Sequence, residues 1–588
     1  MSSNLKDPDL ISVQEVRSKV EEAYAAWQRY RTFSQEQVDG IVERVAAAAR
    51  SHARRLAELA VEETGYGNVA DKLAKNLLCC DVLPRAMRGL KTVGVLRELP
   101  EQKMVEIGVP MGVVAAILPT TNPTSTAIYK TLISLKAGNG IVLSPHPRAK
   151  ACTCETAAVL QQAALAAGAP EGLVQCIYNS TLDATNALMK HPRTSVILST
   201  GGSGIVRAAY SSGKPAFGVG PGNVPVLLDR SAQLEEAVAK VVEGKSFDYG
   251  TVCSSEQCIV AEHDLREPIL AALKTRKAFV CDARQTEALA RLLLTPNFTV
   301  NPDCVGQAAP KIARMAGIQA PADTSVLVVE IQGVGKQHPL SAEKLSPVLS
   351  LYFVADFAAA LDACEALLRF GGLGHTAVIH ASDDTRIREF ALRMPAFRVL
   401  ANTSAPQGST GITTNVFPAM TLGCGAVAGN ITSDNVGPLN LINIKRLAYM
   451  TRKAEDAFES REFSEISGPI DRHAVVAAVE RYLAKRDLDQ PPAMTTAVVD
   501  RFLESKRGGS TTAPASPPSA VSGTPAAEPL PIVDFVCEDD VRRAVAQSKK
   551  IYVGPASIIT PSARDLALHH DVLVMTDQKK AMRKSTSE

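Results

Sequence analysis

The sequence has almost no excess of charge of either sign. Its 588 residues include 63 Lys and Arg against 61 Asp and Glu, which gives a formal charge of +2. A protein that binds the phosphate backbone of nucleic acid needs a basic surface, so we do not expect nucleic acid to be a main partner. Length alone predicts about three to five domain-sized units, because single hydrophobic cores stop growing near 250–300 residues.

Long apolar runs are missing as well. No segment of the sequence reaches the roughly 18–20 uninterrupted apolar residues that a membrane-spanning helix requires. The first residues, Met1 to Pro8, lack the basic-then-apolar order of a secretory signal. We therefore predict a cytoplasmic protein with no membrane partner.

Cysteine is scarce. The 12 cysteines are about two per cent of the chain, far below the density of a disulfide-stabilised scaffold, and they are typical of cytosolic thiols. The close pairs, Cys79–Cys80 and Cys152–Cys154, have neither a second pair nor a histidine at metal-site spacing. We predict no metal centre and assign these cysteines to helix packing.

What the chain does contain is an alternation of helical and strand-like segments. Apolar spacing predicts amphipathic helices at 13–27 and 41–60. Short apolar, β-branched runs follow, and each leads into an Ala-rich helical stretch. The strand candidates are 112–118, 140–144, 173–178, 195–198, 257–260, 326–330, 348–354 and 377–380. Apolar strands without polar alternation are typical of a parallel sheet covered on both faces, so the predicted fold class is α/β.

The last part of the chain has a different texture. Residues 471–507 predict two amphipathic helices, and 508–531 consist almost entirely of small residues and proline, which predicts a flexible linker. Residues 532–588 then predict a small module with a strand at 551–553. A further helix is expected, with Thr560 as its N-cap and Pro561 at its first position. About 45 foldable residues are marginal for an independent core, so we expect this module to dock on a partner or be completed by one.

Two local patterns indicate chemistry. Cys253 follows a helical run and a turn at Gly250, where backbone amides would lower the thiol pKa and stabilise a nearby oxyanion. The run Thr200–Gly204 is a glycine-rich turn from strand to helix whose amides can face a pyrophosphate. Each pattern alone is weak, because buried cysteines and glycine turns are common. Together they are a stronger indication of an active site.

Residues 10 to 470 resemble the aldehyde dehydrogenase superfamily, and within it the coenzyme A-acylating branch found in bifunctional aldehyde–alcohol dehydrogenases. The motifs that carry the resemblance are Leu118–Thr126, Ser144–Lys150, Ser199–Gly204, Gly218–Asn223, Phe247–Gln257, Glu343–Val348 and Gly371–Thr376. The resemblance implies the aldehyde dehydrogenase fold. Its expected parts are a Rossmann-like NAD-binding domain with N-terminal helices at 1–235, an α/β catalytic thiol domain at 236–430, and an oligomerisation arm at 431–470 that makes a homo-oligomer.

The resemblance also assigns catalytic roles. Cys253 is the expected nucleophile, which forms a thiohemiacetal with an aldehyde and, after hydride transfer to the nicotinamide, a thioester. Asn122 and the Cys253 amide are the expected oxyanion donors. The family usually places this asparagine two residues after a proline, where this chain has Thr121. His375 belongs to the acylating pattern and is expected to line the cleft for cofactor and coenzyme A.

For the cofactor, the resemblance places Thr200, Gly201, Gly202 and Ser203 near the pyrophosphate and Glu343 on the nicotinamide ribose. Hydrolytic relatives hold the adenosine ribose with a lysine and a glutamate, and this chain has Ser144–His146 there instead. NAD is therefore the expected cofactor from the branch alone, and NADP stays open.

The acyl acceptor is also indicated by the resemblance. Hydrolytic members carry a glutamate that activates water, whereas the aligned stretch Phe217–Gly220 has no carboxylate. We expect coenzyme A to take the acyl group of a short-chain aldehyde. Two alternatives stay open: a hydrolytic enzyme with Asp248 or Glu256 as base, and a non-catalytic scaffold or shell-cargo protein.

The C-terminal module has its own resemblance. Segments 534–540 and 558–566 look similar to parts of enzymes packaged in bacterial microcompartments. This implies targeting to shell proteins by the module or by the helices before it. The alternative is an accessory module for subunit contacts. Bifunctional relatives continue into an iron-dependent alcohol dehydrogenase domain, so alcohol formation by this chain is not expected.

Overall fold

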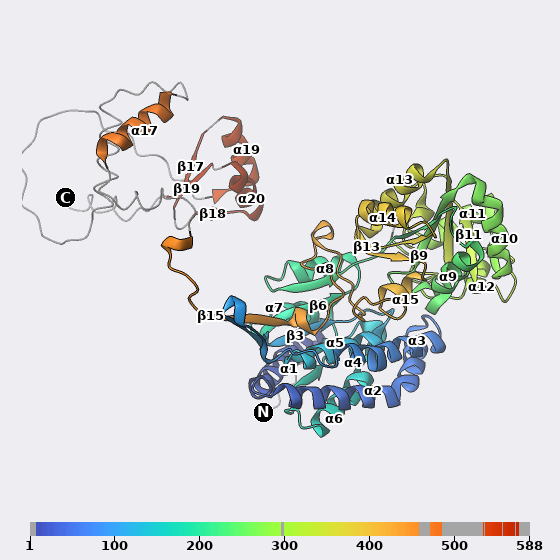
Figure 1. Ribbon diagram of the computed structural model, residues 1–588, viewed down its shortest axis with the longest axis horizontal. Helices are drawn as coiled ribbons and strands as arrows, with labels where there is room; N and C mark the ends of the chain where they lie inside the picture. The colour runs from blue at the N-terminus through green and yellow to red at the C-terminus, as the bar shows by residue number, and fades with distance from the viewer. Residues whose placement is uncertain are drawn as a thin grey trace, which may run out of the picture. The chain divides into compact units, whose positions relative to one another are not determined.

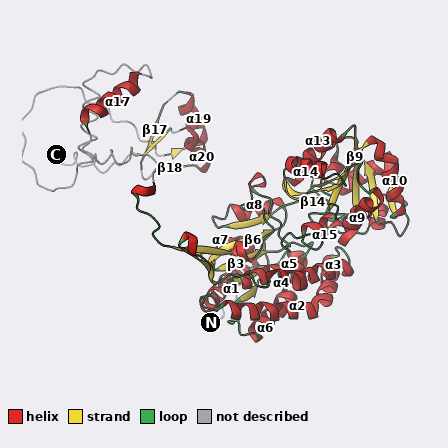
Figure 2. Cartoon of the chain, in the orientation of Figure 1, coloured by secondary structure: helices red, strands yellow, loops and turns green. Residues whose placement is uncertain are grey.

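The structure is a computed structural model that describes residues 7–295, 299–457, 471–484 and 533–575, the last range with gaps at 534, 548, 555–556 and 571. The chain divides into two compact units, Met1–Ala457 and Phe458–Glu588. The first unit contains two parallel sheets, each covered by helices, and a third, antiparallel sheet (Figures 1 and 2).

The N-terminal helices confirm the predicted helical region. They are α1 (Pro8–Tyr30), α2 (Gln35–Thr64), α3 (Val69–Leu77), a π-helical turn (Leu78–Val82) and α4 (Leu83–Met87). Asp7 caps α1 by accepting hydrogen bonds from the amides of Asp9 and Leu10. Ser34 and Gln37 form a capping box that begins α2. Within the described residues, no helix is both long and apolar enough to cross a membrane.

The first parallel sheet has the strand order β5-β4-β3-β6-β7. Its strands are β3 (Val113–Ile117), β4 (Gly140–Ser144), β5 (Val174–Cys176), β6 (Thr194–Thr200) and β7 (Ala216–Val219). Its helices are α5 (Pro123–Lys136), α6 (Lys150–Ala166), α7 (Leu182–Lys190) and α8 (Ser203–Tyr210). Successive residues of a strand face opposite sides. Val113 and Ala115 pack against α1 and α7, whereas Val114 and Ala116 pack against α2, α5 and α6. Both faces are therefore buried, as predicted.

The second parallel sheet has the order β10-β11-β12-β9-β8-β13-β14. Its strands are β8 (Val224–Leu228), β9 (Glu256–Glu262), β10 (Ala278–Val280), β11 (Val326–Glu330), β12 (Val348–Val354), β13 (Gly374–His380) and β14 (Ala396–Ala401). Its helices are α9 (Leu234–Ser246), α10 (Arg266–Thr275), α11 (Ala283–Leu293), α12 (Ala309–Met315), α13 (Phe357–Leu367), α14 (Asp384–Arg393) and α15 (Ala405–Ser409). Figure 1 shows α10 to α14 gathered around this sheet, which is also buried on both faces.

Sheet membership differs from two of the expected domain ranges. β8 pairs with β9 and β13, so the chain enters the second sheet between Val219 and Val224, earlier than the expected boundary at 235/236. The antiparallel sheet consists of β1 (Gly94–Leu99), β2 (Met104–Pro110) and β15 (Ile442–Ala448). Two of its strands precede the first parallel sheet, and the third, β15, lies within the expected arm at 431–470. Such pairing between distant segments leaves no mark in local sequence patterns.

The second unit is described by itself. It contains α17 (Arg472–Ala484) and a small module with β16 (Phe535–Val536), α19 (Glu538–Ala546), β17 (Ile551–Val553), β18 (Ile558–Ile559), α20 (Pro561–His570) and β19 (Leu573–Met575). The strand predicted at 551–553 is confirmed. Thr560 caps α20 as predicted, since its Oγ1 accepts a hydrogen bond from the Ala563 amide at 3.3 Å. The second predicted amphipathic helix, after 484, and the linker at 508–531 lie outside the described residues.

A side chain at Gly374, the first residue of β13, is expected to destabilise the fold. Gly374 has φ +77°, and a Cβ there would lie 1.9 Å from the carbonyl oxygen of Cys424. Gly374→Ala is expected to lower the free energy of unfolding in urea titration by more than about 2 kcal/mol. The left-handed backbone alone costs an alanine ~1–2 kcal/mol, and the overlap adds to that. Gly213→Ala is the control, because Gly213 has φ +79° and no atom within 4 Å of the new Cβ. Equal losses would contradict the close packing at Gly374.

Candidate active site

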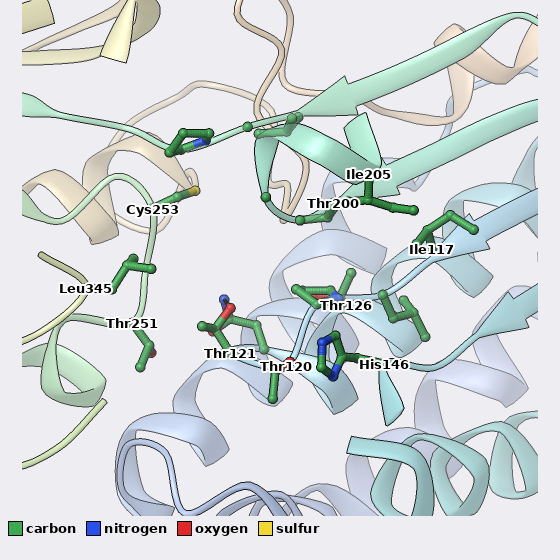
Figure 3. Close-up of a pocket in the computed structure, with 18 of the residues that line it drawn as sticks. Ile117, Thr120, Thr121, Thr126, His146, Thr200, Ile205, Thr251, Cys253 and Leu345 are labelled. Atoms are coloured by element: carbon green, nitrogen blue, oxygen red, sulfur yellow. Dashed lines mark hydrogen bonds between the residues drawn. The ribbon is translucent and has the colours of Figure 1, made fainter. Parts of the chain in front are cut away.

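A cavity of about 680 Å³ lies between the two parallel sheets. The first sheet contributes the segments that follow β3, β4, β6 and β7, and the second sheet contributes the segments that precede β9 and β12. Figure 3 shows Cys253, Thr251 and Leu345 on one side and Thr200, Ile205 and Ile117 on the other. The carboxyl edge of one sheet therefore faces the amino edge of the other, and loops at the carboxyl edge are where α/β sheets bind ligands.

Cys253 lies in this cavity, half-buried, on the segment between α9 and β9. Its Sγ is 3.3 Å from Nε2 of His375, a residue 122 positions later in the chain. Burial, together with the negative charge of Glu343, raises the pKa of the Cys253 thiol to about 12. The expectation of a lowered thiol pKa is therefore wrong. Cys253 precedes a strand rather than a helix, so no helix dipole offsets the loss of solvent.

His375 is fully buried on β13. Burial and the neighbouring Arg398 lower the pKa of its imidazole to about 3. Its Nδ1 lies 3.0 Å from Thr376 Oγ1. The raised thiol pKa and the lowered imidazole pKa both disfavour transfer of the proton from Cys253 to His375. The resting site therefore contains a neutral thiol beside a neutral imidazole rather than an ion pair.

The predicted oxyanion side chain also reaches the cavity. Asn122 is the N-cap residue of α5, and it lines the cavity together with Thr120 and Thr121. Its Nδ2 donates to Thr121 Oγ1 at 3.2 Å. Its Oδ1 accepts from Lys75 Nζ at 2.5 Å. The structure thus places Asn122 and Cys253 on walls contributed by different sheets.

The glycine-rich turn contributes the next part of the wall. Thr200, Gly201 and Gly202 line the cavity, and Thr200 Oγ1 is buried without a hydrogen-bond partner. Ser203, in contrast, is exposed at the first position of α8 and is not a cavity-lining residue. An unpaired hydroxyl and two glycines before a helix N-terminus fit the pyrophosphate of a dinucleotide. Thr200, Gly201 and Gly202 would hold that group.

Glu343 lies in the cavity wall opposite the glycine turn. Its Oε1 accepts a hydrogen bond from the Gly222 amide at 3.1 Å. Burial raises the pKa of this carboxyl to about 7. A Cβ on Gly222 would lie 2.2 Å from the Cys253 carbonyl oxygen and 3.1 Å from the His375 ring. The Gly218–Asn223 motif therefore requires glycine at 222 so that Cys253, His375 and Glu343 can pack together.

The two alternative bases do not reach the cavity. Asp248 is fully buried and pairs with Lys72 and Lys75, and this pairing offsets its burial and lowers its pKa. Glu256 is also buried, with Oε1 bonded to the Ala405 amide. Among the described residues that line the cavity, Glu343 is the single carboxylate. The described part of the chain also contains no group of three His, Cys, Asp or Glu side chains able to hold a metal ion.

Sequence patterns missed Lys72 and Lys75. Both lysines lie on α3 and are buried, with 2% and 3% of their surface exposed. Two lysines on a helix normally predict a face exposed to solvent, so the sequence gave no indication that these two are buried. Asp248 was considered as a base and is instead their buried counter-ion.

Comparisons with known proteins agree with this geometry. The profile of the "Aldehyde dehydrogenase family" matches residues 3–286. The acetylating succinate-semialdehyde dehydrogenase of Clostridium kluyveri is 34% identical over 75% of this chain and 97% of that protein. The chain belongs to the aldehyde dehydrogenase family. The bifunctional aldehyde-alcohol dehydrogenase of Escherichia coli K12 is 42% identical over 74% of this chain. The match covers only 50% of that relative's length.

Solved structures of family members are similar in fold. An acetylating aldehyde dehydrogenase from Geobacillus thermoglucosidasius has a TM-score of 0.75 and 48% identity, and the match covers 76% of this chain and 99% of that one. Two propionaldehyde dehydrogenases each have a TM-score of 0.67 and 28% identity over 74% of this chain and 97% of theirs. One comes from a fucose-utilisation bacterial microcompartment of Clostridium phytofermentans. The other, from Rhodopseudomonas palustris, was solved with bound CoA and an acylated cysteine. The predicted family and fold are confirmed.

Removal of the negative charge of Glu343 is expected to make the Cys253 thiol more reactive. Glu343→Gln removes a negative charge that raises the Cys253 pKa and keeps an acceptor for the Gly222 amide. At pH 8, alkylation of Cys253 by iodoacetamide, followed by peptide mass spectrometry, is expected to become at least about threefold faster. Glu287→Gln, an exposed carboxylate paired with Arg291, is the control and should not change the rate. An unchanged or slower rate in Glu343→Gln would contradict the electrostatic account.

Proposed function

We propose that this aldehyde dehydrogenase oxidises a short-chain aldehyde to its acyl-coenzyme A, with reversible reduction of NAD. The observation that carries the proposal is the setting of Cys253. A histidine lies against its sulfur, and β7, which supplies the water-activating glutamate in hydrolytic members, contributes no carboxylate. The relatives include an acetylating succinate-semialdehyde dehydrogenase and an acylating sulfoacetaldehyde dehydrogenase, and one solved relative carries both CoA and an acylated cysteine.

The cavity wall fits a dinucleotide and a thiol substrate. Thr200, Gly201 and Gly202 would bind the pyrophosphate of NAD, with Ser203 at the mouth of the turn, and Glu343 would accept hydrogen bonds from the nicotinamide ribose. When bound, NAD supplies the hydride acceptor. In this arrangement the first sheet, up to Val219, is the NAD-binding domain. The second sheet carries the nucleophile.

The first chemical step is addition of the thiol to the aldehyde. The Cys253 sulfur bonds to the carbonyl carbon, and the thiol proton passes through His375 Nε2 to the carbonyl oxygen, which gives a neutral thiohemiacetal. Because a resting thiolate is disfavoured, the proton leaves as the carbon–sulfur bond forms. The Asn122 amide and the Cys253 main-chain amide stabilise the negative charge that develops on oxygen.

Oxidation and transfer follow. Loss of a hydride from carbon and a proton from the hydroxyl leaves an acyl thioester on Cys253, with His375 as the nearest proton acceptor. Coenzyme A then attacks the acyl carbon, its sulfur replaces the Cys253 sulfur, and its thiol proton returns to Cys253. His375 Nε2, 3.3 Å from Sγ, is placed to carry that proton. Without the β7 glutamate that activates water in hydrolytic members, the thioester persists until the second thiol arrives.

The test is a steady-state assay of NADH formation from acetaldehyde or propionaldehyde, with and without coenzyme A. We expect the steady rate with coenzyme A to exceed the rate without it by at least about 10²-fold, because β7 does not supply the glutamate that activates water in hydrolytic members. The assay is repeated with NADP to establish the cofactor preference. Equal rates with and without coenzyme A would support a hydrolytic enzyme instead. No turnover with any aldehyde would support a scaffold.

Two variants separate the chemistry from general damage to the site. Cys253→Ala is expected to abolish turnover, and His375→Ala to lower kcat by about 10²-fold, in the range of a lost general acid–base group. His263→Ala replaces an exposed histidine and should leave kcat unchanged. Full activity of Cys253→Ala would end the proposal.

We also propose that the chain is a cytoplasmic homo-oligomer that enters a microcompartment through its second unit. Support for the oligomer comes from apolar side chains exposed on and after β15: Ile444 at 42%, Leu447 at 45% and Met450 at 75%. Support for the compartment comes from the Clostridium phytofermentans relative and from the resemblance of segments 534–540 and 558–566.

The C-terminal part of the second unit, residues 508–588, can be removed to test this localisation. Deletion of residues 508–588 is expected to keep the coenzyme A-dependent activity and to reduce co-sedimentation with co-expressed shell proteins by at least about fivefold, because short docking segments carry such binding. Size-exclusion chromatography with light scattering of both proteins reports the oligomer. Unchanged co-sedimentation of the truncated chain would discard targeting by the module and leave it as a subunit-contact element.

A further inference from the structure

Lys75 joins the two walls of the active site. It lies on α3 with only 3% of its surface exposed. Its Nζ hydrogen-bonds Asp248 Oδ2 and lies 2.5 Å from Asn122 Oδ1 and 3.4 Å from Thr251 Oγ1. One amine therefore contacts both the loop that carries the oxyanion side chain and the segment that leads into Cys253, two residues after Thr251.

The chemistry of this contact fixes which way the Asn122 amide faces. Burial lowers the pKa of Lys75 to about 8 despite its ion pair with Asp248, so near pH 7 the group is mostly an ammonium. An ammonium group has donors and no acceptor, so only the amide oxygen of Asn122 can lie against it. The amide nitrogen must then face away, and it lies 3.2 Å from Thr121 Oγ1 on the cavity wall. Oxyanion stabilisation needs the N–H group and not the C=O group on the cavity side. A donor-only partner behind Asn122 enforces that choice.

The lysine is itself held in place. Asp248 has a left-handed backbone at φ 46°, its Oδ1 accepts from the Asn68 amide at 2.9 Å, and its Oδ2 accepts from Thr251 Oγ1 at 2.6 Å. Lys72 Nζ reaches the same carboxylate oxygen at 3.0 Å. Four donors therefore converge on one buried carboxylate, and their hydrogen bonds fix where the Lys75 amine can lie.

We propose that Lys75 is a positioning residue that orients the Asn122 side-chain amide, so that its N–H group faces the oxygen of the bound aldehyde. The assignment rests on the proposed function for the role of Asn122. Lys75 does not line the cavity, so it acts on the reaction through Asn122 and not by contact with substrate.

A double-mutant cycle tests this role. Lys75→Met removes the donors and keeps the length of the side chain, and Asn122→Ala removes the amide. Each is expected to lower kcat for NADH formation from acetaldehyde by about 10²-fold, as for a lost oxyanion donor, with KM for the aldehyde changed less than about threefold. The double variant is expected within about threefold of the slower single variant, because both substitutions remove one interaction.

Lys72→Met is the matched control. Lys72 contacts the same carboxylate oxygen, but its second partner is the main-chain oxygen of Thr121 and not the Asn122 side chain. The fold-loss in kcat caused by Lys72→Met is expected to multiply with the fold-loss caused by Asn122→Ala.

If Lys75→Met does not fold, the activities of Lys75→Arg and Lys75→Gln are compared instead. Arginine offers donors only, whereas glutamine also offers an acceptor, so Lys75→Arg is expected to be at least about tenfold more active.

The outcomes separate this assignment from the proposed function. A Lys75→Met kcat within threefold of the wild type, effects of Lys75→Met and Asn122→Ala that multiply, or equal activities of Lys75→Arg and Lys75→Gln would each overturn the positioning role. NADH formation by the wild type without dependence on coenzyme A would overturn the acyl acceptor alone, because the cycle is read on aldehyde oxidation. A wild type that forms no NADH would overturn both.

Discussion

The rest of the structure depends on how the two parallel sheets are placed. The carboxyl edge of the first sheet faces the amino edge of the second across a cavity. The first sheet ends its strands in loops that carry a glycine turn and Asn122. The second begins its strands after the segments that carry Cys253 and Glu343. Lys72 and Lys75, buried on α3, link the Asn122 loop to the segment before Cys253 through their ion pairs with Asp248. Cys253, Asn122 and Glu343 therefore reach one cavity from elements whose positions the cores determine, and His375 Nε2 lies 3.3 Å from the Cys253 sulfur.

Burial decides the resting chemistry of this cavity. It raises the pKa of the Cys253 thiol to about 12 and lowers the pKa of the His375 imidazole to about 3, so both side chains are neutral at rest. A neutral thiol resists oxidation and metal binding between turnovers, because the thiolate is the reactive form. In the proposed reaction, the same desolvation would strengthen the hydrogen bonds that form when charge develops on the aldehyde oxygen. Low resting reactivity and stabilisation of the proposed transition state would then have one physical origin.

Local patterns predicted most of the scaffold, because buried parallel strands are continuous apolar runs. The bounds of β11 and β12 are those expected. The motifs also pointed to Cys253, Asn122, His375 and Glu343, and the fold brings these four residues together. What local patterns missed depends on distant contacts. β8 joins the second sheet through partners far along the chain, and the pKa of Cys253 depends on burial that adjacent residues do not encode. Lys75 is visible only after α3 packs against the loop that contains Asp248.

A single-turnover experiment tests the central claim that this cavity holds an acyl group on sulfur until a second thiol arrives. The enzyme is mixed with excess aldehyde and NAD without coenzyme A, and intact mass and NADH are followed together. The account predicts about one NADH per active site, an acyl adduct on Cys253 that persists for many turnover times, and its release as acyl-coenzyme A when coenzyme A is added. Continuous NADH formation with accumulation of free carboxylate, and no adduct, would contradict it.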